Sequence, residues 1–349
     1  MTTVHHLTPT FQTHDALGQH TKELHALVEK LGFRSCIWSL EKKRSTPARN
    51  AKHFRIKSSE DVLIYQVATG SSLVEKIIKS DAKLIVNYHN ITPAKYFDRW
   101  SPDLASELRK GRRQLTQLVD RTCLAIADSE YNAGELRALG FSDIEVIPVL
   151  FKLGERTKKE ERVKPLQNGS QWLFIGRTVP NKAQHDLIVA FATYREHYDS
   201  ESKLVLIGTG LASYEKAIQD LIHELDLQKS VKTVDSVTEE EKRHYFSSSD
   251  IYVSLSEHEG FGVPMIEAMH YGLPVLAYDA AAVRETLGGE GLLLNSKTPT
   301  EVAAVVHETL QDPQIFNALV LGGRHRSEEI SLESNLENYK ASLLPLLNG

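Results

Sequence analysis

The chain has 349 residues, of which 41% are hydrophobic and 25% are charged, and its formal net charge is −5. This length exceeds the size at which a single hydrophobic core stops growing, so we expect a soluble globular protein of two domains. No apolar run reaches the length of a membrane-spanning helix, so an integral membrane protein built on such helices is not expected.

The start of the sequence and the cysteines indicate the compartment. Met1–His6 is polar and lacks the basic region and the apolar core of a secretory signal peptide, so we expect a cytoplasmic protein. The two cysteines, Cys36 and Cys123, each lie in an apolar, strand-like run. Reduced core thiols are therefore expected, and neither a disulfide nor a zinc site.

Residues 1–150 alternate between short apolar strands and helical patterns. They carry 21 Lys and Arg against 17 Asp and Glu, a net charge of +4, whereas the rest of the chain carries 20 against 29, a net charge of −9. The clearest helix is the amphipathic segment Leu17–Leu31, which ends at Gly32. The expected strands of this half are Val4–Leu7, Arg34–Ser39, Val62–Gln66, Leu84–Tyr88, Leu124–Ala127 and Ile144–Ile147.

Two loops of this half follow expected strands. Asp15–His20 leads into the first helix, and Asp15 is expected to cap that helix. Gly18 has no side chain, so its backbone could approach a ligand closely. Asn87–Pro93 follows another strand, which places His89 at a carboxyl end. His89 either contacts a ligand there or is satisfied by nearby backbone.

A segment with aromatic and basic residues follows. Lys95–Trp100 contains Tyr96, Phe97 and Trp100, and Arg109–Arg113 contains four cations. Trp and Tyr prefer the membrane interface, and each cation near an anionic leaflet contributes about 1 kcal/mol. The pattern predicts peripheral contact of the N-terminal domain with an anionic membrane at the inner face. A solvated basic helix face is the alternative.

The composition changes after residue 151. Lys152–Arg162 is a charged stretch with little to bury, and Pro165 and Asn168 follow it. We expect a linker at residues 152–168 between an N-terminal domain, residues 1–151, and a C-terminal domain, residues 169–330. Residues 331–349 are expected to form a helical segment that could return to the N-terminal domain.

The second half repeats the alternation of strands and helices, with Asp186–His197 and Tyr214–Leu225 as helices. Its expected strands are Trp172–Ile175, Leu204–Ile207, Val231–Val234, Ile251–Leu255, Pro274–Ala277 and Leu292–Leu294. Apolar strands separated by helices predict parallel sheets covered on both faces. The expected fold class is α/β, with two doubly wound, Rossmann-like domains that face each other across a cleft and bind ligands at the carboxyl ends of their strands.

One strand of the second half runs into a pair of cations. It ends in Gly176 and Arg177, and Lys182 follows before the next helix. Two cations at one strand end can neutralise a diphosphate, and a guanidinium can bind two phosphate oxygens at once. Two unrelated surface cations are the alternative.

The segment Ser256–Met269 carries the most specific pattern of the chain. Glu259 and Glu267 flank a glycine-rich turn, and Pro264 can open a helix. The turn consists of Gly260, Phe261, Gly262 and Val263. Such a turn suits a phosphate, because glycine lacks a Cβ and the first amides of a helix have no partner inside it. Two solvated glutamates at a helix start are the alternative.

Together these motifs resemble the retaining glycosyltransferases of the family 4 type, which have the GT-B fold. The likeness is to enzymes of bacterial surface-polysaccharide and lipopolysaccharide synthesis, and it extends along most of the chain. The chain departs from the family at Lys182-Ala183, where the family usually has Lys-Gly. The residues that carry the resemblance are Asp15–Gly18, Asn87–Asn90, Gly176, Arg177, Lys182, Glu259 and Glu267 with the turn between them.

The resemblance implies the roles of these residues. A nucleotide diphosphate sugar, such as GDP-mannose or a UDP-hexose, would be the donor, a glycan or lipid-linked hydroxyl would be the acceptor, and no cofactor would be needed. Glu259 would lie beside the donor sugar, and Glu267 would bind the ribose. The remaining assignments are Arg177 and Lys182 to the diphosphate, Gly18, Gly176 and the turn of residues 260–263 to the donor, and His89 to the sugar or acceptor.

The implied reaction is hexose transfer with retention at the anomeric carbon. In the family view the acceptor attacks on the leaving-group face, and the departing phosphate takes its proton. The sequence contains no Asp-x-Asp, so a metal-independent reaction is expected, with Arg177 and Lys182 stabilising the leaving diphosphate. His5, His6, His14 and His20 lack the Cys or Asp framework of a metal site.

Three other classes remain open. A nucleotide-sugar 2-epimerase shares the fold but usually carries other acids and histidines. A phosphorylase would need a lysine that binds pyridoxal phosphate, and none can be identified. A non-catalytic sugar-binding protein of two α/β domains would normally be exported. A nucleic-acid partner is not expected.

Overall fold

The structure is a computed structural model that describes residues 2–12, 15–42, 46–56, 58–156 and 169–348. The chain forms two compact units. Unit 1 comprises Met1–Asp98, Pro102–Lys152 and Ile330–Gly349, and unit 2 comprises Arg99–Ser101 and Leu153–Glu329. Residues 157–168, which form most of the predicted linker, lie outside the described residues.

Unit 1 is built on a parallel sheet that has seven strands in the described part of the chain, in the order β3-β2-β1-β4-β5-β6-β7. The order reverses between β1 and β4, which is the doubly wound arrangement. The strands are β1 (Thr3–Phe11), β2 (Arg34–Lys42), β3 (Arg49–Asn50), β4 (Val62–Val67), β5 (Lys83–Tyr88), β6 (Thr122–Ala127) and β7 (Ile144–Val146). The six strands expected from the sequence are confirmed. Strand β3 was not expected from the sequence, because it consists of two polar residues at the edge of the sheet.

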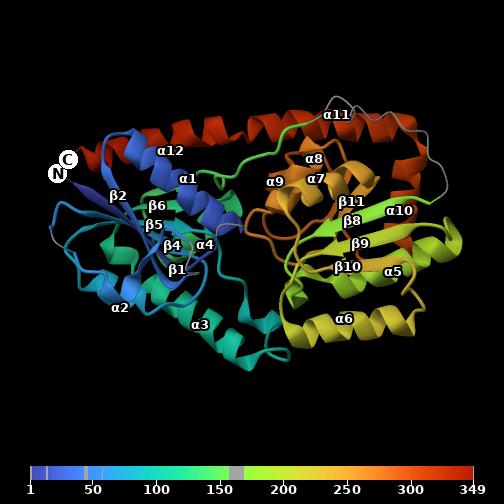
Figure 1. Ribbon diagram of the computed structural model, residues 1–349, viewed down its shortest axis with the longest axis horizontal. Coiled ribbons are helices and arrows are strands. Elements are labelled where there is room, and N and C mark those ends of the chain that lie inside the picture. Colours follow the sequence, from blue (N-terminus) through green and yellow to red (C-terminus); the bar gives the residue numbers. More distant parts are fainter. Residues whose placement is uncertain (1, 13–14, 43–45, 57, 157–168, 349) are drawn as a thin grey trace. The chain divides into compact units, whose positions relative to one another are not determined.

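Helices cover both faces of this sheet (Figure 1). On one face, α1 (Ala16–Lys30) and α12 (Leu332–Leu347) pack together on a core that contains Leu24, Ile85 and Leu343. Helices α2 (Leu73–Ile78) and α3 (Pro102–Thr116) lie on the other face, and α4 (Glu130–Leu139) follows β6. The C-terminal helix therefore completes the core of unit 1.

Unit 2 repeats the plan with a parallel sheet that has six strands among the described residues, in the order β10-β9-β8-β11-β12-β13. Its strands are β8 (Gln171–Ile175), β9 (Lys203–Ile207), β10 (Val231–Val234), β11 (Ile251–Ser254), β12 (Val275–Tyr278) and β13 (Leu292–Leu294). Each one matches an expected strand, so the α/β prediction is confirmed in both halves.

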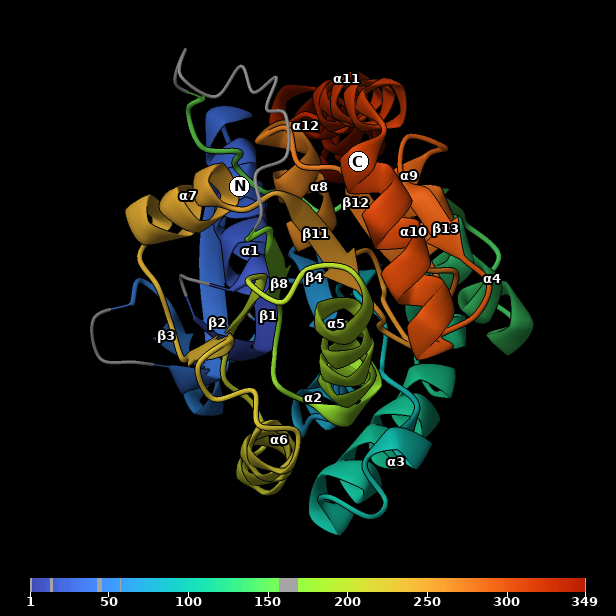
Figure 2. The same ribbon diagram turned by 90° about the vertical axis from the view of Figure 1, so that its right-hand side faces the viewer.

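The helices of unit 2 also form two layers. Figure 1 and Figure 2 show α5 (Gln184–His197) and α6 (Ala212–Glu224) on one side of the sheet and α7 (Glu239–Ser248), α8 (Val263–His270) and α11 (Pro313–Glu329) on the other. Helix α10 (Pro299–Gln311) packs on α5, and the short α9 (Val283–Leu287) lies beside α8. None of the described helices is long and apolar enough to cross a membrane.

Two fully buried histidines lie in the core of unit 1. His6 on β1 and His20 on α1 are both 0% exposed. Burial first, and then repulsion by His25 and His5, lowers the pKa of His6 from 6.5 to about 3. Burial and the neighbouring His89 lower the pKa of His20 in the same direction. Both side chains are therefore neutral in the folded protein at neutral pH.

Acidification is expected to destabilise unit 1 through His6. The unfolded chain takes up a proton below pH 6.5, whereas folded His6 does so only near pH 3. Neutral His6 therefore makes its full contribution to the free energy of unfolding above pH 6.5, the pKa of the unfolded chain. Between that pH and about pH 3, this contribution falls by about 1.4 kcal/mol for each pH unit. Hydrogen exchange of the β1 amides should show this slope, and His6→Gln, which cannot titrate at this position, should make it shallower, while His20 continues to contribute. The exposed substitution His223→Asn should leave the slope unchanged, and an equal slope in all three proteins would contradict the prediction.

Candidate functional site

The order of the sheet in unit 2 reverses between β8 and β11. In doubly wound sheets, ligands bind outside the carboxyl ends of the strands at this reversal. The chain leaves β8 at Gly176 and Arg177, and it leaves β11 into the loop that carries Glu259. Predicted site residues from two segments that lie far apart in the sequence therefore emerge at neighbouring strand ends.

Lys182 and Glu259 form an ion pair at this point. The Nζ atom of Lys182 lies 2.5 Å from Oε2 of Glu259, and their side chains are only 18% and 10% exposed. Lys182 ends the short 3-10 helix Pro180–Lys182, and Ala183, the residue before α5, has a positive φ of 50°. This is the position at which the sequence departs from the family's Lys-Gly, and alanine adopts the left-handed backbone that glycine would favour. The resemblance assigned Lys182 to the diphosphate and Glu259 to the donor sugar, and the structure shows that these two side chains form an ion pair.

Hydrogen bonds fix the two loops that carry this ion pair. The backbone N–H of Glu257 donates to the carbonyl of Asn181 at 2.8 Å, and Nδ2 of Asn181 donates to the carbonyl of His258 at 3.2 Å. Nζ of Lys297 lies 2.5 Å from both Asp186 and Glu257, so it ties the β11–α8 loop to the start of α5. These contacts therefore fix the β11–α8 loop relative to the segment that leads into α5.

Arg177 presents a cation at the same strand end. Its side chain is exposed and makes no hydrogen bond or ion pair with the described residues, while its backbone carbonyl accepts a hydrogen bond from Nε2 of Gln184 at 2.8 Å. The backbone is thus anchored and the guanidinium is available for an anion. Among the described residues no group of three or more His, Cys, Asp or Glu side chains could hold a metal ion.

The glycine-rich turn leads directly into α8. Gly262 precedes the helix with φ +101°, a conformation that favours glycine, and no side chain caps the helix. Phe261 is buried, and its carbonyl accepts a hydrogen bond from Thr286. Gly260 and Val263 are partly exposed on either side. Pro264 has no N–H, and the N–H of Met265 donates to the carbonyl of Gly262 at 3.0 Å, so the N–H of Val263 is the first amide of α8 that could face an anion. Binding of a phosphate at this turn stays a prediction.

Glu267 lies on α8 and is held by a lysine that the sequence did not single out. Nζ of Lys242 lies 2.6 Å from Oε1 of Glu267, and the glutamate side chain is 10% exposed. Burial raises the pKa of Glu267, and attraction to Lys242 opposes that shift. The pKa of Lys242 is raised, because Glu267 and Glu239 more than offset the lowering effect of burial. Each partner therefore favours the charged form of the other.

In unit 1, both ring nitrogens of His89 have partners. Nδ1 lies 2.9 Å from Oδ2 of Asp128, and Nε2 lies 2.6 Å from Oε1 of Gln66. Burial raises the pKa of Asp128, and His89 opposes that rise. A contact of either ring nitrogen with a sugar requires that one of these partners be displaced. The partners are side chains, not the backbone groups expected in the structural interpretation.

Gly18 has a structural reason to be glycine. Its backbone N–H donates to Oδ1 of Asp15 at 2.6 Å, so the prediction that Asp15 caps the first helix is confirmed. A Cβ at Gly18 would lie 1.6 Å from the carbonyl oxygen of Gln12, which no side chain could tolerate. In the structure, Gly18 therefore lies close to the backbone of its own loop at Gln12. A close approach of Gly18 to the donor stays a prediction.

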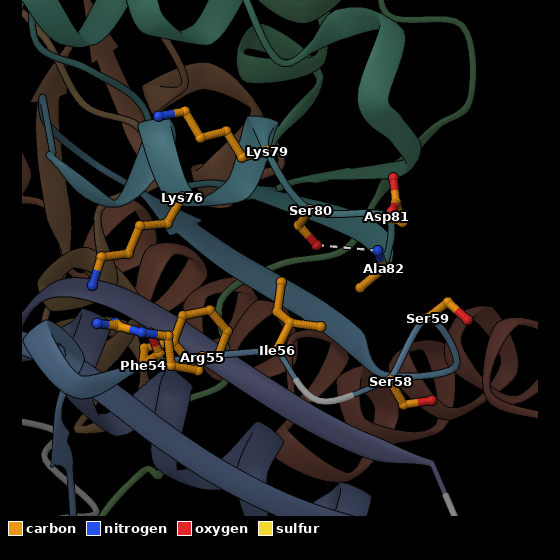
Figure 3. A pocket seen from close by; sticks show the side chains of 10 residues that line it. All are labelled: Phe54, Arg55, Ile56, Ser58, Ser59, Lys76, Lys79, Ser80, Asp81 and Ala82. Carbon is orange, nitrogen blue, oxygen red and sulfur yellow. Dashed lines mark hydrogen bonds between the residues drawn. The ribbon is translucent and has the colours of Figure 1, made fainter.

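A cavity of about 600 Å³ in unit 1 lies away from these residues. Its lining includes Ser80 and Ala82, which precede β5, whereas His89 follows the other end of that strand. Figure 3 shows the charged ends of Arg55 and Lys76 side by side at one end of the cavity. Both cations donate to backbone carbonyls of residues 51–54. None of the predicted donor-binding residues lines this cavity.

The sequence of unit 2 matches a known family. Residues 155–326 match the family model described as "Glycosyl transferases group 1". This match includes Arg177, Lys182, Glu259 and Glu267. Residues 155–326 of the chain are thus similar to the group 1 glycosyltransferases.

Curated relatives of the chain include several sugar transferases. The chain is 32% identical over 155 residues to MMP alpha-(1->4)-mannosyltransferase of Mycolicibacterium hassiacum, covering 44% of this chain and 37% of the relative. It is 26% identical over 263 residues to D-inositol 3-phosphate glycosyltransferase of Kineococcus radiotolerans, covering 67% and 60%. It is 24% identical over 211 residues to an O-antigen chain mannosyltransferase of Salmonella typhimurium, covering 60% and 56%. The chain thus spans less than two thirds of the length of each relative.

Similar solved structures show that the chain has the GT-B fold. Sucrose-phosphate synthase from Thermosynechococcus elongatus matches with a TM-score of 0.78 at 16% identity and covers 100% of both chains. Anabaena HepE, solved with UDP and glucose, matches with a TM-score of 0.76 at 18% identity and covers 98% of this chain and 99% of its own. At such identities the likeness concerns the fold alone.

Proposed function

We propose that the protein is a retaining glycosyltransferase of the family 4 type. It transfers a hexose from a nucleotide diphosphate sugar to a hydroxyl group of a glycan or a lipid-linked acceptor in surface-polysaccharide synthesis. The observation that carries the proposal is the Lys182–Glu259 pair, which lies where the strand order reverses. Mannosyltransferases among the relatives and UDP in the structure of HepE support GDP-mannose or a UDP-hexose as the donor.

The proposed reaction uses the charges of the site in turn. Arg177, Lys182 and the N-terminus of α8 bind the diphosphate and offset the negative charge that develops as the bond between the anomeric carbon and the phosphate oxygen breaks. The acceptor oxygen forms the new bond on the same face, and its proton passes to the departing phosphate. Glu259 lies beside the sugar, where its carboxylate stabilises positive charge on the ring.

The experiment that tests this function is a screen of nucleotide sugars by thermal shift, followed by a product assay. A ligand that binds the native state raises Tm, so the true donor should stand out from the panel. The donor is then incubated with and without candidate glycan and lipid-linked acceptors. Acceptor-dependent release of the nucleotide, with the same anomeric configuration in product and donor, is the expected result. A free sugar or an epimerised product formed without acceptor would instead identify an epimerase.

Activity is expected to survive a chelator. The proposed charge stabilisation comes from Arg177, Lys182 and backbone amides, all of which the chain itself supplies. Turnover measured before and after treatment with EDTA should therefore agree within about twofold, since a change of that size is well below 1 kcal/mol. Complete loss of activity that magnesium or manganese restores would overturn the metal-independent mechanism.

We further propose that the protein is cytoplasmic and docks reversibly on anionic membranes through unit 1. The structure narrows the surface predicted for this contact. Phe97 is 3% exposed, and the Trp100 ring packs edge-to-face on Tyr214 at 5.0 Å, so these aromatic side chains do not form an open face. Arg109 pairs with Asp98, and Arg112 reaches Glu135 at 3.1 Å, but Lys110 and Arg113 are exposed on α3. Electrostatic attraction through α3 is the remaining basis of the proposal.

Binding to vesicles that contain anionic lipid is therefore expected to depend on salt. Co-sedimentation should be substantial at low ionic strength and weak at high ionic strength, because salt screens exposed charges. Changing Lys110 and Arg113 to Ser should remove about 1 kcal/mol of attraction per cation, whereas changing the exposed Lys216 and Lys229 of unit 2 should have no effect. Absence of binding at low salt would rule out docking.

A further inference from the structure

Lys242 is a charged side chain on the inward side of a helix. It lies on α7 one turn before Phe246, which is 0% exposed, and only 17% of its own side chain is exposed. Charged residues rarely occupy such positions unless they are paired. Its Nζ atom lies 2.6 Å from Oε1 of Glu267 and 3.0 Å from Oε2 of Glu239.

Stability alone does not account for the pair of Lys242 and Glu267. Two buried charges lose their hydration, and replacing such a pair by apolar side chains of similar volume is often neutral or stabilising. An apolar residue at position 242 would continue the contact surface of Phe246 on the same face of α7. The presence of a cation there points to a role for its charge.

The two oxygens of the Glu267 carboxylate have different surroundings. Lys242 holds Oε1, whereas Oε2 makes no hydrogen bond with the described residues. Glu267 lies on α8, the helix that the glycine-rich turn begins. A carboxylate that is fixed at one oxygen presents the other as an acceptor in a set direction, and it accepts hydroxyl hydrogen bonds most strongly when it is ionised.

We propose that Lys242 is a positioning residue that holds the Glu267 carboxylate for recognition of the ribose, so that the site selects ribonucleotides over deoxyribonucleotides. This inference rests on the proposed function, in which Glu267 binds the ribose of the donor. Ribose offers two adjacent hydroxyl donors to the carboxylate, and 2′-deoxyribose offers only one.

The electrostatic surroundings define what loss of Lys242 would do. Among the described residues, the titratable groups that act on Glu267 are Lys242 and Glu239 from α7 and Tyr252 from β11. Burial and Glu239 both raise the pKa of Glu267, and Lys242 is the group that lowers it. Without Lys242 the carboxyl should remain protonated to higher pH. Ribose recognition should then weaken near neutral pH and return as the pH rises and the carboxyl ionises.

The test compares binding of UDP and GDP with binding of their 2′-deoxy counterparts by calorimetry, across the neutral and alkaline range. Wild-type protein should bind the ribonucleotide more tightly by about tenfold or more, the effect of one hydrogen bond to a charged group. Lys242→Met should remove most of this preference near neutral pH without weakening the deoxynucleotide, and alkaline pH should restore it. Lys242→Arg keeps a cation and should retain the preference. The exposed substitution Lys229→Met is the matched control.

The outcomes separate this inference from the proposed function. Equal weakening of ribonucleotide and deoxynucleotide by Lys242→Met would assign Lys242 a structural role only, and an unchanged preference would deny it any role. Either result overturns the inference while leaving the proposed transferase intact. If the wild-type protein binds nucleotides without any preference for ribose, the role proposed for Glu267 fails first. Should Lys242→Met fail to fold, the pH dependence of the wild-type preference decides, since the preference must decline in acid as Glu267 is protonated.

Discussion

Lys182→Ala is expected to lower kcat by about 10²- to 10³-fold, the range found when one group that stabilises developing negative charge is removed. Lys182 is the cation closest to Glu259 and is mostly buried, so bulk water and other cations cannot readily take its place. Steady-state rates with saturating donor and acceptor measure the effect. Turnover within a few-fold of the wild-type rate would exclude Lys182 from the reaction.

Two further proteins distinguish chemistry from folding in this experiment. Lys216→Ala removes a lysine that is 75% exposed and paired with Asp220, and it should keep wild-type activity and Tm. Lys182→Ala also leaves Glu259 buried without its partner, which lowers Tm. The double substitution Lys182→Ala with Glu259→Ala removes both charges and should recover much of that loss in Tm while staying inactive. A double variant less stable than both single variants would show that the two residues do not act as a pair.

Glu267→Ala is expected to weaken binding of the nucleoside diphosphate by about 1.5–3 kcal/mol, or roughly 10- to 150-fold, because its carboxylate accepts hydrogen bonds from the ribose. Calorimetry with the free nucleotide measures this loss directly. Lys242 keeps Glu239 as a partner at 3.0 Å in the variant, so the fold should tolerate the change. Unchanged affinity would remove Glu267 from the donor site.

Glu259→Ala should behave differently from Glu267→Ala. Its carboxylate is proposed to lie beside the sugar, so turnover should fall more than the affinity for free nucleotide. Glu308→Ala, an exposed substitution on α10, should change neither quantity. Equal loss of affinity for the free nucleotide and the sugar nucleotide in Glu259→Ala would place this residue on the nucleotide instead.

The strands could be predicted from the sequence because they are buried on both faces. Segments such as Val62–Val67 are fully buried, so a nearly continuous apolar run, interrupted here only by Gln66, identifies them without any tertiary information. Arg49-Asn50 carries no such signal, since an edge strand of two polar residues is defined only by its neighbour β2. The glycine-rich turn could be found because its backbone requires glycine, as the positive φ of Gly262 shows, whereas the two glutamates were found through the resemblance to a known family.

The partners of the site residues could not be predicted in the same way. Lys242 precedes Glu267 by 25 positions, and Asn181 precedes His258 by 77, and no periodic pattern links residues at such separations. Lys242 reads in the sequence as one more cation in the charged stretch Glu239–Arg243. Only the packing of α7 and α8 on the same side of the sheet shows that it faces a carboxylate. Asp128 and Gln66 escaped notice for the same reason, since their link to His89 is made by neighbouring strand ends.

Helix α12 has a consequence for the order in which the protein folds during synthesis. Its residues Tyr339, Leu343 and Leu347 belong to the core around Val4 and Ile85, yet they leave the ribosome after all of unit 2. Domains usually fold as units in the order of their synthesis. Unit 1 must therefore wait for α12, so unit 2 can complete its core first, and the part of the unit 1 core that α12 covers stays exposed until α12 has been synthesised.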